Sequence, residues 1–371
     1  DSRRTEIIHD VSDISLEDLI PKEQVVVTIS DSDYIKRLSL QTYRIQRRGG
    51  VGLIGMETKE RDNIKTMFIT NSHDYILFFT NRGRVFWLKA YNIPEGGRHA
   101  KGRPIINLLP RLDEGEIVEQ TIPVSEFTQG EFLTFATKRG FVKKTPLYAY
   151  RRPMVSGIWA IKLREDDELI DVRITDGSKE IILASRNGQA CRFSEMDFRP
   201  TGRHTQGVIG MRLNEGDEVV SMTVTDDTNI LFTITENGYG KRSYVSDYRK
   251  TRRGGKGVQT IKTTERNGPV VCVMEVEDDD ELLIQSLEGM VIRIPVEQIR
   301  IISRRTSGVS IMKLRKKDKV VAVARLFRDE IEEKILEDGE SKGLVSDNEG
   351  CLLYTSPSPR DRTRSRMPSS A

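Results

Sequence analysis

The chain has 371 residues, a hydrophobic fraction of 37% and a formal net charge of +3, which suits one large or two medium globular domains. No stretch approaches the roughly 18 to 20 apolar residues that a membrane-spanning helix needs. Cys191, Cys272 and Cys351 are far apart and form no C-x-x-C pair, so they suggest neither a zinc site nor a redox site. We therefore expect a cytoplasmic chain with no membrane partner and no bound metal.

The sequence repeats a unit of about 50 residues six times, a period typical of propellers and solenoids. A tight turn recurs at Gly83, Gly140, Gly188, Gly238 and Gly289, with Asp33 at this place in the first unit. A second glycine follows at Gly52, Gly102, Gly157, Gly207, Gly257 and Gly308, 19 positions later in five units and 17 in the third. A third turn then opens into aliphatic residues at Ile64, Ile117, Leu169, Val219, Val270 and Val320. This regular spacing indicates six copies of one structural unit.

Short runs rich in β-forming residues flank the tight turn of each unit. Residues 181–184 precede Asn187-Gly188 and residues 189–193 follow it, which predicts a hairpin because these turn residues tolerate positive φ. Helical periodicity is lacking, so we expect about four short strands per unit and almost only β structure from Val25 to Leu326. One such sheet cannot bury both faces alone. The predicted fold is therefore all-β, with six four-stranded blades in a propeller-like disc; a solenoid is the alternative.

Basic residues gather in the loop before each second glycine. They are Arg44, Arg47, Arg48, Arg98, Lys101, Arg103, Arg151, Arg152, Arg199, Arg203, Arg249, Lys250, Arg252, Arg253, Lys256, Arg300, Arg304 and Arg305. Acidic residues are expected instead in the third turns, such as Asp113-Glu114, residues 165–168 and residues 278–281. Because each sign keeps a fixed phase of the repeat, stacking would make a nearly neutral chain strongly two-sided.

A basic side of this kind favours contact with a polyanion. The glycines beside the arginines would let the backbone approach phosphates and offer N–H donors without sequence preference. Few aromatic residues accompany the basic loops, so stacking on single-stranded bases is a weaker interpretation. A single basic loop is as readily explained by solubility. Six loops in phase favour nucleic acid.

The run Gln46-Arg47-Arg48-Gly49-Gly50-Val51-Gly52 closely resembles the gyrase box, the basic glycine-rich heptapeptide in the first blade of the C-terminal domain of the DNA gyrase A subunit. The resemblance extends from about Arg3 to Leu326 and implies a six-bladed β-pinwheel. The family motif usually has lysine where this chain has Val51, so one cation is missing from the box. A second run of this kind, at residues 252–257, keeps its lysine but lies in the fifth unit.

Two sets of residues are predicted to bind DNA. The gyrase box comprises Gln46, Arg47, Arg48, Gly49, Gly50, Val51 and Gly52. The rim set comprises Arg44, Arg98, Lys101, Arg103, Arg151, Arg152, Arg203, Arg252, Arg253, Lys256, Arg304 and Arg305.

The resemblance implies a module of a type IIA topoisomerase. Such a module bends double-stranded DNA around its rim and sets the positive crossing used in ATP-dependent negative supercoiling. The gyrase B subunit would be the partner in an A2B2 complex, and ATP and magnesium would act elsewhere, so no cofactor is expected in this chain. The family cleaves DNA with a tyrosine in its N-terminal region, and nothing here resembles that motif, so no catalytic residue is predicted and the fragment alone should be inactive.

Two alternatives remain open. The C-terminal domain of the A-type subunit of topoisomerase IV is the nearer one, although it typically has fewer or degenerate blades and no clear box. A protein-interaction β-propeller of the WD40 or kelch type is the other, but its signatures are absent.

The expected organisation has four parts. Residues 1–24 would be a linker from a missing N-terminal cleavage domain, because residues 3–7 resemble its end, and residues 25–327 would be the DNA-wrapping pinwheel. Residues 328–350 would be an acidic tail, and residues 351–371 a non-native or read-through tail. The expected location is cytoplasmic and associated with the nucleoid.

Overall fold

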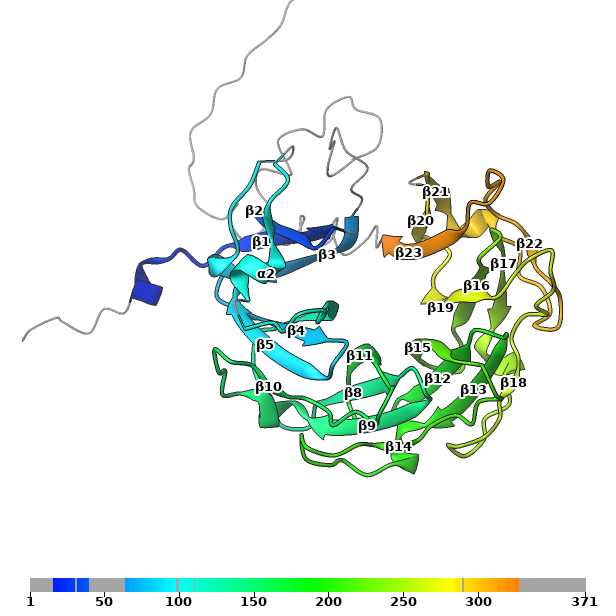
Figure 1. Cartoon of the computed structure of the whole chain (residues 1–371), viewed down its shortest axis with the longest axis horizontal. Helices are drawn as coiled ribbons and strands as arrows, with labels where there is room; N and C mark the ends of the chain where they lie inside the picture. The colour runs from blue at the N-terminus through cyan, green and yellow to red at the C-terminus, as the bar shows by residue number, and fades with distance from the viewer. Residues whose placement is uncertain are drawn as a thin grey trace, which may run out of the picture. The chain divides into compact units, whose positions relative to one another are not determined.

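The computed structural model describes residues 16–30, 32–39, 64–97, 100–109, 111–288 and 290–326. Within these residues the chain forms six separate antiparallel sheets, one for each predicted unit. Figure 1 shows these blades following one another in chain order around a ring, from blue β1 to orange β23. The predicted six-bladed, all-β fold is therefore confirmed, and the solenoid is wrong.

Three strands of each blade come from its own repeat: an inner strand and a two-stranded hairpin. In blades 1 to 6 the hairpins are β1 (Gln24–Ser30) with β2 (Tyr34–Ser39), β4 (Tyr75–Thr80) with β5 (Arg84–Lys89), β8 (Phe132–Thr137) with β9 (Phe141–Pro146), β12 (Glu180–Ser185) with β13 (Gln189–Ser194), β16 (Ile230–Thr235) with β17 (Tyr239–Tyr244), and β20 (Glu281–Ser286) with β21 (Val291–Pro295). The inner strands are β3 (Ile64–Asn71), β7 (Val118–Val124), β11 (Leu169–Thr175), β15 (Val219–Thr225), β19 (Val270–Val276) and β23 (Val320–Leu326). Inner strands of successive blades contact one another from β7 to β23, and β23 contacts β3.

The outermost strand of each of the first five blades is supplied by the repeat that follows. These exchanged strands are β6 (Arg103–Pro104), β10 (Ile158–Trp159), β14 (Val208–Ile209), β18 (Val258–Gln259) and β22 (Val309–Ser310). For example, Val208 pairs with Val142 and Ile209 with Phe141 of the preceding blade. Blade 6 has three strands among the described residues. The predicted four strands per blade are thus present in five blades, but each fourth strand joins two neighbouring repeats.

The two glycines that mark each repeat are explained by this exchange. Gly207 has φ +79°, and a Cβ added there would lie 2.6 Å from the carbonyl oxygen of Val142. At the other end of the exchanged segment, the carbonyl of Gly140 accepts hydrogen bonds from the amides of Gly210 and Met211, at 2.9 and 3.0 Å. Both glycines therefore allow one backbone to lie directly against the next blade. This role differs from the predicted approach to phosphates.

Five apolar cores lie between consecutive blades. The hairpin of blade 2 shows why, because its strand β4 has Ile76 and Phe78 in the core shared with blade 1, and Leu77 and Phe79 in the core shared with blade 3. Successive residues of a strand point to opposite faces, so both faces of the sheet are buried. Burial of the hairpin aliphatics, as predicted, therefore holds neighbouring blades together.

Short helical turns interrupt the predicted β structure. Beyond η1 (Leu16–Leu19), each hairpin from blade 2 onward is followed by a 3-10 turn: η2 (Ala90–Asn92), η3 (Leu147–Tyr150), η4 (Glu195–Asp197), η5 (Val245–Asp247) and η6 (Val296–Gln298). The helix α2 (Ile105–Leu108) follows β6. None is long enough to produce a helical period in the sequence.

Candidate nucleic-acid interface

The predicted basic loops lie at the outer edge of the ring. We call them the edge loops and define them as residues 94–102, 151–157, 199–207, 249–257 and 300–308. Each leads into an exchanged strand at the end of its sheet farthest from the inner strand. Before reaching it, the loop runs beside the second hairpin strand of the preceding blade, as the Lys144–Pro200 and Arg192–Lys250 bridges show. The exchange of strands therefore places five basic segments along one outer edge.

The edge loops are almost free of negative charge. They contain 14 lysine and arginine residues against one acid, Glu95. The five residues before an inner strand carry the opposite sign in blades 2 to 4: residues 113–117, 164–168 and 214–218 each have a formal charge of −3. The predicted separation of the two signs is therefore present in these blades. One assignment was wrong, because residues 278–280 lie between β19 and β20, Glu281 begins β20, and none of them precedes an inner strand.

Four rim residues at the first two edge loops are exposed, and two of them contact aromatic rings. The Nζ atom of Lys101 lies 4.3 Å from the centre of the Tyr34 ring. Arg151 stacks on Tyr148, 3.8 Å from its ring centre, and donates to the Tyr148 carbonyl at 3.2 Å. Arg103 and Arg152 are also exposed. Aromatic contacts of this kind orient a cation without neutralising it.

The rim residues of the later edge loops fall into two groups. Arg252, Lys256 and Arg305 are exposed, and within the described residues their side chains form no salt bridge or hydrogen bond. Arg253 instead donates to the carbonyls of Asp197 and Ile209, at 3.1 and 3.3 Å. Arg304 is half-buried and donates to the carbonyls of Asp247 and Gln259, at 3.1 and 3.0 Å. Arg253 and Arg304 thus attach their loops to the neighbouring blade and have fewer donors left for a ligand.

The remaining predicted residues are neither exposed cations nor residues whose side chains are shown to bind the neighbouring blade. Arg203 is half-buried, and its carbonyl accepts a hydrogen bond from Lys143. Arg44, Arg98 and the whole gyrase box at residues 46–52 lie outside the described residues.

A set of buried lysines below the edge loops escaped the sequence prediction. Lys36, Lys143 and Lys241 occupy the third position of the second hairpin strand in blades 1, 3 and 5, and each is at most 1% exposed. The Nζ of Lys143 donates to the carbonyls of Ala160 and Arg203, at 2.6 and 2.7 Å. Burial, with the nearby charge of Arg203, lowers the pKa of Lys143 to about 7. These lysines hold the edge loops by their backbone.

The next position along the same strand forms a second set of clasps. The guanidinium of Arg192 donates to the carbonyls of Val245 and Tyr248 at the 3-10 turn of the next blade, at 2.9 and 3.1 Å. The corresponding donors in the other interfaces are Arg37, Trp87, Lys144 and Arg242, whose acceptors are the carbonyls of Ile93, Tyr150, Glu195 and Ile299. In each of the five described interfaces, the fourth residue of the second hairpin strand therefore donates a side-chain hydrogen bond to the next blade. The recurring basic residue after the tight turn was the sequence signal for it.

Salt bridges join the turns that precede the inner strands. Lys138 lies between Glu168 and Glu218, at 3.3 and 3.5 Å, and Arg186 lies between Glu218 and Glu236, at 3.1 and 2.5 Å. Acids of these turns are therefore paired with cations of the hairpin turns. Among the exposed cations of the edge loops, Lys250 is paired with Glu180 at 2.6 Å, whereas Arg252, Lys256 and Arg305 form no salt bridge within the described residues. This difference makes the outer edge the candidate anion-binding side.

Two negative findings concern the described residues alone. No helix among them is long and apolar enough to cross a membrane. No cluster of three histidine, cysteine or acidic side chains among them could hold a metal ion.

Comparison with known proteins agrees with this architecture. The chain matches the family described as DNA gyrase C-terminal domain, β-propeller, in six segments: residues 24–71, 74–125, 131–176, 179–226, 229–274 and 280–326. The DNA gyrase A subunit of Halalkalibacterium halodurans is 52% identical over 92% of this chain and 40% of that protein. The gyrase A subunit of Clostridium acetobutylicum is 47% identical over 94% of this chain and 42% of that protein. The chain thus spans less than half the length of these relatives.

Solved structures show the same fold. A DNA gyrase A C-terminal domain superposes with a TM-score of 0.66 and 28% identity, covering 82% of this chain and 100% of that one. The C-terminal domain of DNA topoisomerase IV superposes with a TM-score of 0.76 and 28% identity, covering 87% of this chain and 99% of that one. The six matched segments coincide with the six blades, and the chain belongs to the family of DNA gyrase C-terminal β-propeller domains.

Proposed function

We propose that this chain binds duplex DNA along its outer edge and wraps it as the C-terminal module of the DNA gyrase A subunit. The observation that carries the proposal is the charge of the five edge loops, which together contain 14 lysine and arginine residues and only one acidic residue. Strand exchange supports it, because exchange brings all five loops to the same edge. Contacts from lysine, arginine and backbone amides to phosphates bind DNA without reading its sequence.

Wrapping requires many such contacts. Smooth bending of even 20 to 30 base pairs by 40 to 90° costs on the order of 1 to 6 kcal/mol. A rim that distributes its cations over successive blades can offset this cost along the whole path. If roughly ten phosphates are neutralised, the logarithm of the binding constant falls against the logarithm of salt concentration with a slope near −9.

The role in the complete enzyme follows from the relatives, which are named as A subunits of DNA gyrase. In this proposal the wrapped segment sets a positive crossing, which a complex with the gyrase B subunit converts into negative supercoils with ATP. This chain supplies DNA binding and no catalytic residue, and it neither cleaves DNA nor binds ATP or magnesium. The gyrase box at residues 46–52 would begin the wrap in the first blade.

A matched pair of variants tests edge binding. The edge variant combines Arg152→Ala, Arg252→Ala and Arg305→Ala. The control variant combines Arg82→Ala, Arg139→Ala and Lys179→Ala, which remove the same charge from exposed turns that already contain acidic partners. Binding of a fluorescent duplex is measured by anisotropy over a range of salt concentrations. The edge variant should lose about three units of salt slope and the control much less. Equal losses would refute edge binding.

Topoisomerase IV is the second candidate, because its C-terminal domain gives the higher TM-score of the two solved structures compared. The similarity to gyrase A subunits over more than nine tenths of the chain favours gyrase. The two candidates differ in the topology they impose on DNA. A positive change in linking number on binding favours gyrase, and unchanged topology favours topoisomerase IV.

A further inference from the structure

The turn before the inner strand reverses its charge around the ring. Its five residues have a formal charge of −3 in each of blades 2 to 4, at residues 113–117, 164–168 and 214–218. Residues 265–269 of blade 5 are neutral, and residues 315–319 of blade 6 have a charge of +3. The backbone of the turn is nevertheless the same: Gly216 has φ +75° and Lys317, at the same place, has φ +73°. The reversal is therefore a property of the side chains and not of the turn.

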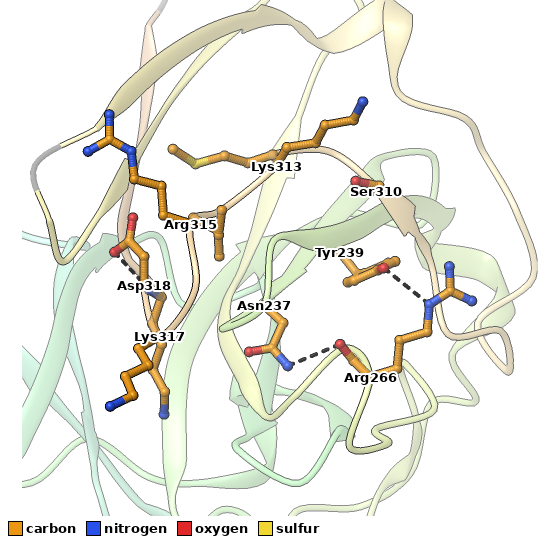
Figure 2. A pocket seen from close by; sticks show the side chains of 11 residues that line it. Asn237, Tyr239, Arg266, Ser310, Lys313, Arg315, Lys317 and Asp318 are labelled. Atoms are coloured by element: carbon orange, nitrogen blue, oxygen red, sulfur yellow. Dashed lines mark hydrogen bonds between the residues drawn. The ribbon is translucent and has the colours of Figure 1, made fainter.

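This basic turn forms one wall of a groove of about 540 Å³ between blades 5 and 6 (Figure 2). The cations that line it are Arg266, Lys313, Arg315, Lys317 and Lys319. Lys319 is paired with Glu236 at 2.6 Å. Within the described residues, Lys313, Arg315 and Lys317 form no salt bridge. Such a concentration of like charge favours an anionic ligand.

The opposite wall holds Arg266 in place. Its Nε donates to the hydroxyl of Tyr239 at 3.1 Å, and its guanidinium lies 5.0 Å from the centre of that ring. Asn237 fixes the backbone beside it by donating to the Arg266 carbonyl at 3.0 Å (Figure 2). Within the part of the chain that the structure describes, the terminal amino groups of Arg266 form no hydrogen bond and are open to a ligand. An arginine oriented in this way is suited to phosphate oxygens.

The groove is continuous with the outer edge. Ser310, which lines the groove, belongs to the exchanged strand β22, and β22 follows the edge loop that carries Arg305. A duplex that passes Arg305 on the edge therefore meets the groove within a few residues of chain. An isolated cationic patch could suit any acidic partner, but this continuity with the edge favours the same duplex.

We propose that the groove between blades 5 and 6 is a second binding site for the phosphate backbone of duplex DNA, which leads DNA from the outer edge onto the turn face of the last two blades. The inference rests on the proposed DNA binding. It adds a second binding site and the direction in which the duplex would leave the outer edge. It assigns to the basic turn at residues 315–317 a contact for which the turns of blades 2 to 4, each with a formal charge of −3, are unsuited.

A transplanted turn tests the site without disturbing the fold. The transplant variant gives blade 6 the turn of blade 4, through Arg315→Asn, Lys316→Glu and Lys317→Gly. Because the native residue at position 317 has positive φ, glycine there should not destabilise the turn. The exchange variant adds the reverse transplant, so that the net charge of the chain is unchanged, through Asn214→Arg, Glu215→Lys and Gly216→Lys. Because Gly216 has φ +75°, this last change strains the turn, and the variant is used at temperatures well below its measured unfolding temperature.

Two measurements are made on the full chain. In the first, duplex binding by anisotropy should lose about two to three units of salt slope in the transplant variant and as much in the exchange variant. In the second, acetylation of lysines in the native chain is compared with and without duplex. Lys316 and Lys317 should become protected together with Lys256 of the edge, while Lys179, which is paired with Asp226, should keep its reactivity.

Each other outcome overturns the inference. If Lys256 is protected by DNA but Lys316 and Lys317 are not, the edge binds and the groove does not. If the exchange variant keeps the native salt slope, net charge matters and the groove does not. Protection of Lys316 and Lys317 without DNA would show that another anionic segment of the chain occupies the groove. Absence of all DNA-dependent protection would refute the proposed function itself, and this inference with it.

Discussion

Replacing Arg192 by methionine should loosen the joint between blades 4 and 5. The Arg192 side chain is 3% exposed, and methionine keeps much of its apolar stem but loses the guanidinium, which donates to the carbonyls of Val245 and Tyr248. It also loses the 2.5 Å bond to the carboxylate of Glu180. Unsatisfied buried acceptors cost roughly 1 to 3 kcal/mol each, and breaking a buried ion pair costs roughly 3 to 5 kcal/mol.

Lys250 reduces the expected loss, because it also binds Glu180, at 2.6 Å, and remains in the variant. We therefore expect a loss of about 3 kcal/mol in the free energy of unfolding, at the lower end of the range for a buried pair. Urea unfolding followed by circular dichroism measures it. Hydrogen exchange should also become faster at Thr251, whose amide donates to the Arg192 carbonyl.

The matched control is Lys179→Met, which removes a cation from an exposed pair with Asp226 at 3.2 Å. Pairs of this kind contribute roughly 0 to 1 kcal/mol, so this variant should unfold almost as the native chain does. Similar losses of unfolding free energy in the two variants would refute the view that the fourth residue of the second hairpin strand holds the next blade.

Three further results are expected. Gly207→Ala should lower the unfolding temperature by several degrees, because of its positive φ and the 2.6 Å approach of the added Cβ, whereas Gly202→Ala, with nothing within 4 Å, should not; equal effects would contradict the role of strand exchange. For Lys143, the folded pKa of about 7 lies below the unfolded value of about 10.4, so the unfolded chain binds the extra proton between them and stability rises from pH 7 to pH 10. In the Lys143→Met variant the unfolding temperature should therefore rise less between pH 7 and pH 10 than in the native chain. An equal rise in both would contradict burial of the ammonium. Replacing Arg47 and Arg48 by alanine should weaken wrapping, measured by linking number, more than binding, measured by anisotropy, and equal losses would make the box one phosphate contact among many.

The number of blades and their hairpins could be predicted because both depend on local sequence. A turn such as Asn187-Gly188 fixes a hairpin by its own residues, and its repetition fixes the count. Strand exchange could not be predicted in this way. The exchanged strands β14 and β18 have two residues each, and nothing in so short a segment shows whether it pairs within its own blade or with the blade before.

The clasps were missed for a different reason. Arg192 and Lys143 are charged, and charged residues in a strand usually lie on an exposed face. Here both faces of the sheet pack against other blades, so the alternation of polar and apolar residues no longer separates outside from inside. Only the carbonyls of the next blade, which are distant in the sequence, make these cations stable when buried.

The basic edge was predicted from the phase of its charges, but its details depend on tertiary contacts. Arg252 and Arg253 are neighbours of the same type, yet the side chain of Arg253 donates to carbonyls of the preceding blade and that of Arg252 is exposed. The sequence could indicate which loop carries the cations proposed to bind DNA. It could not indicate which of two adjacent arginines holds the loop and which is available to a phosphate.

The most direct test of DNA wrapping uses nicked circular DNA. The circle is ligated with increasing amounts of the full chain, the protein is removed, and the linking number is read from topoisomers on a gel. Wrapping around the outer edge with a positive crossing predicts a linking number that increases with bound protein and then reaches a plateau. An unchanged linking number at saturating protein would contradict the account.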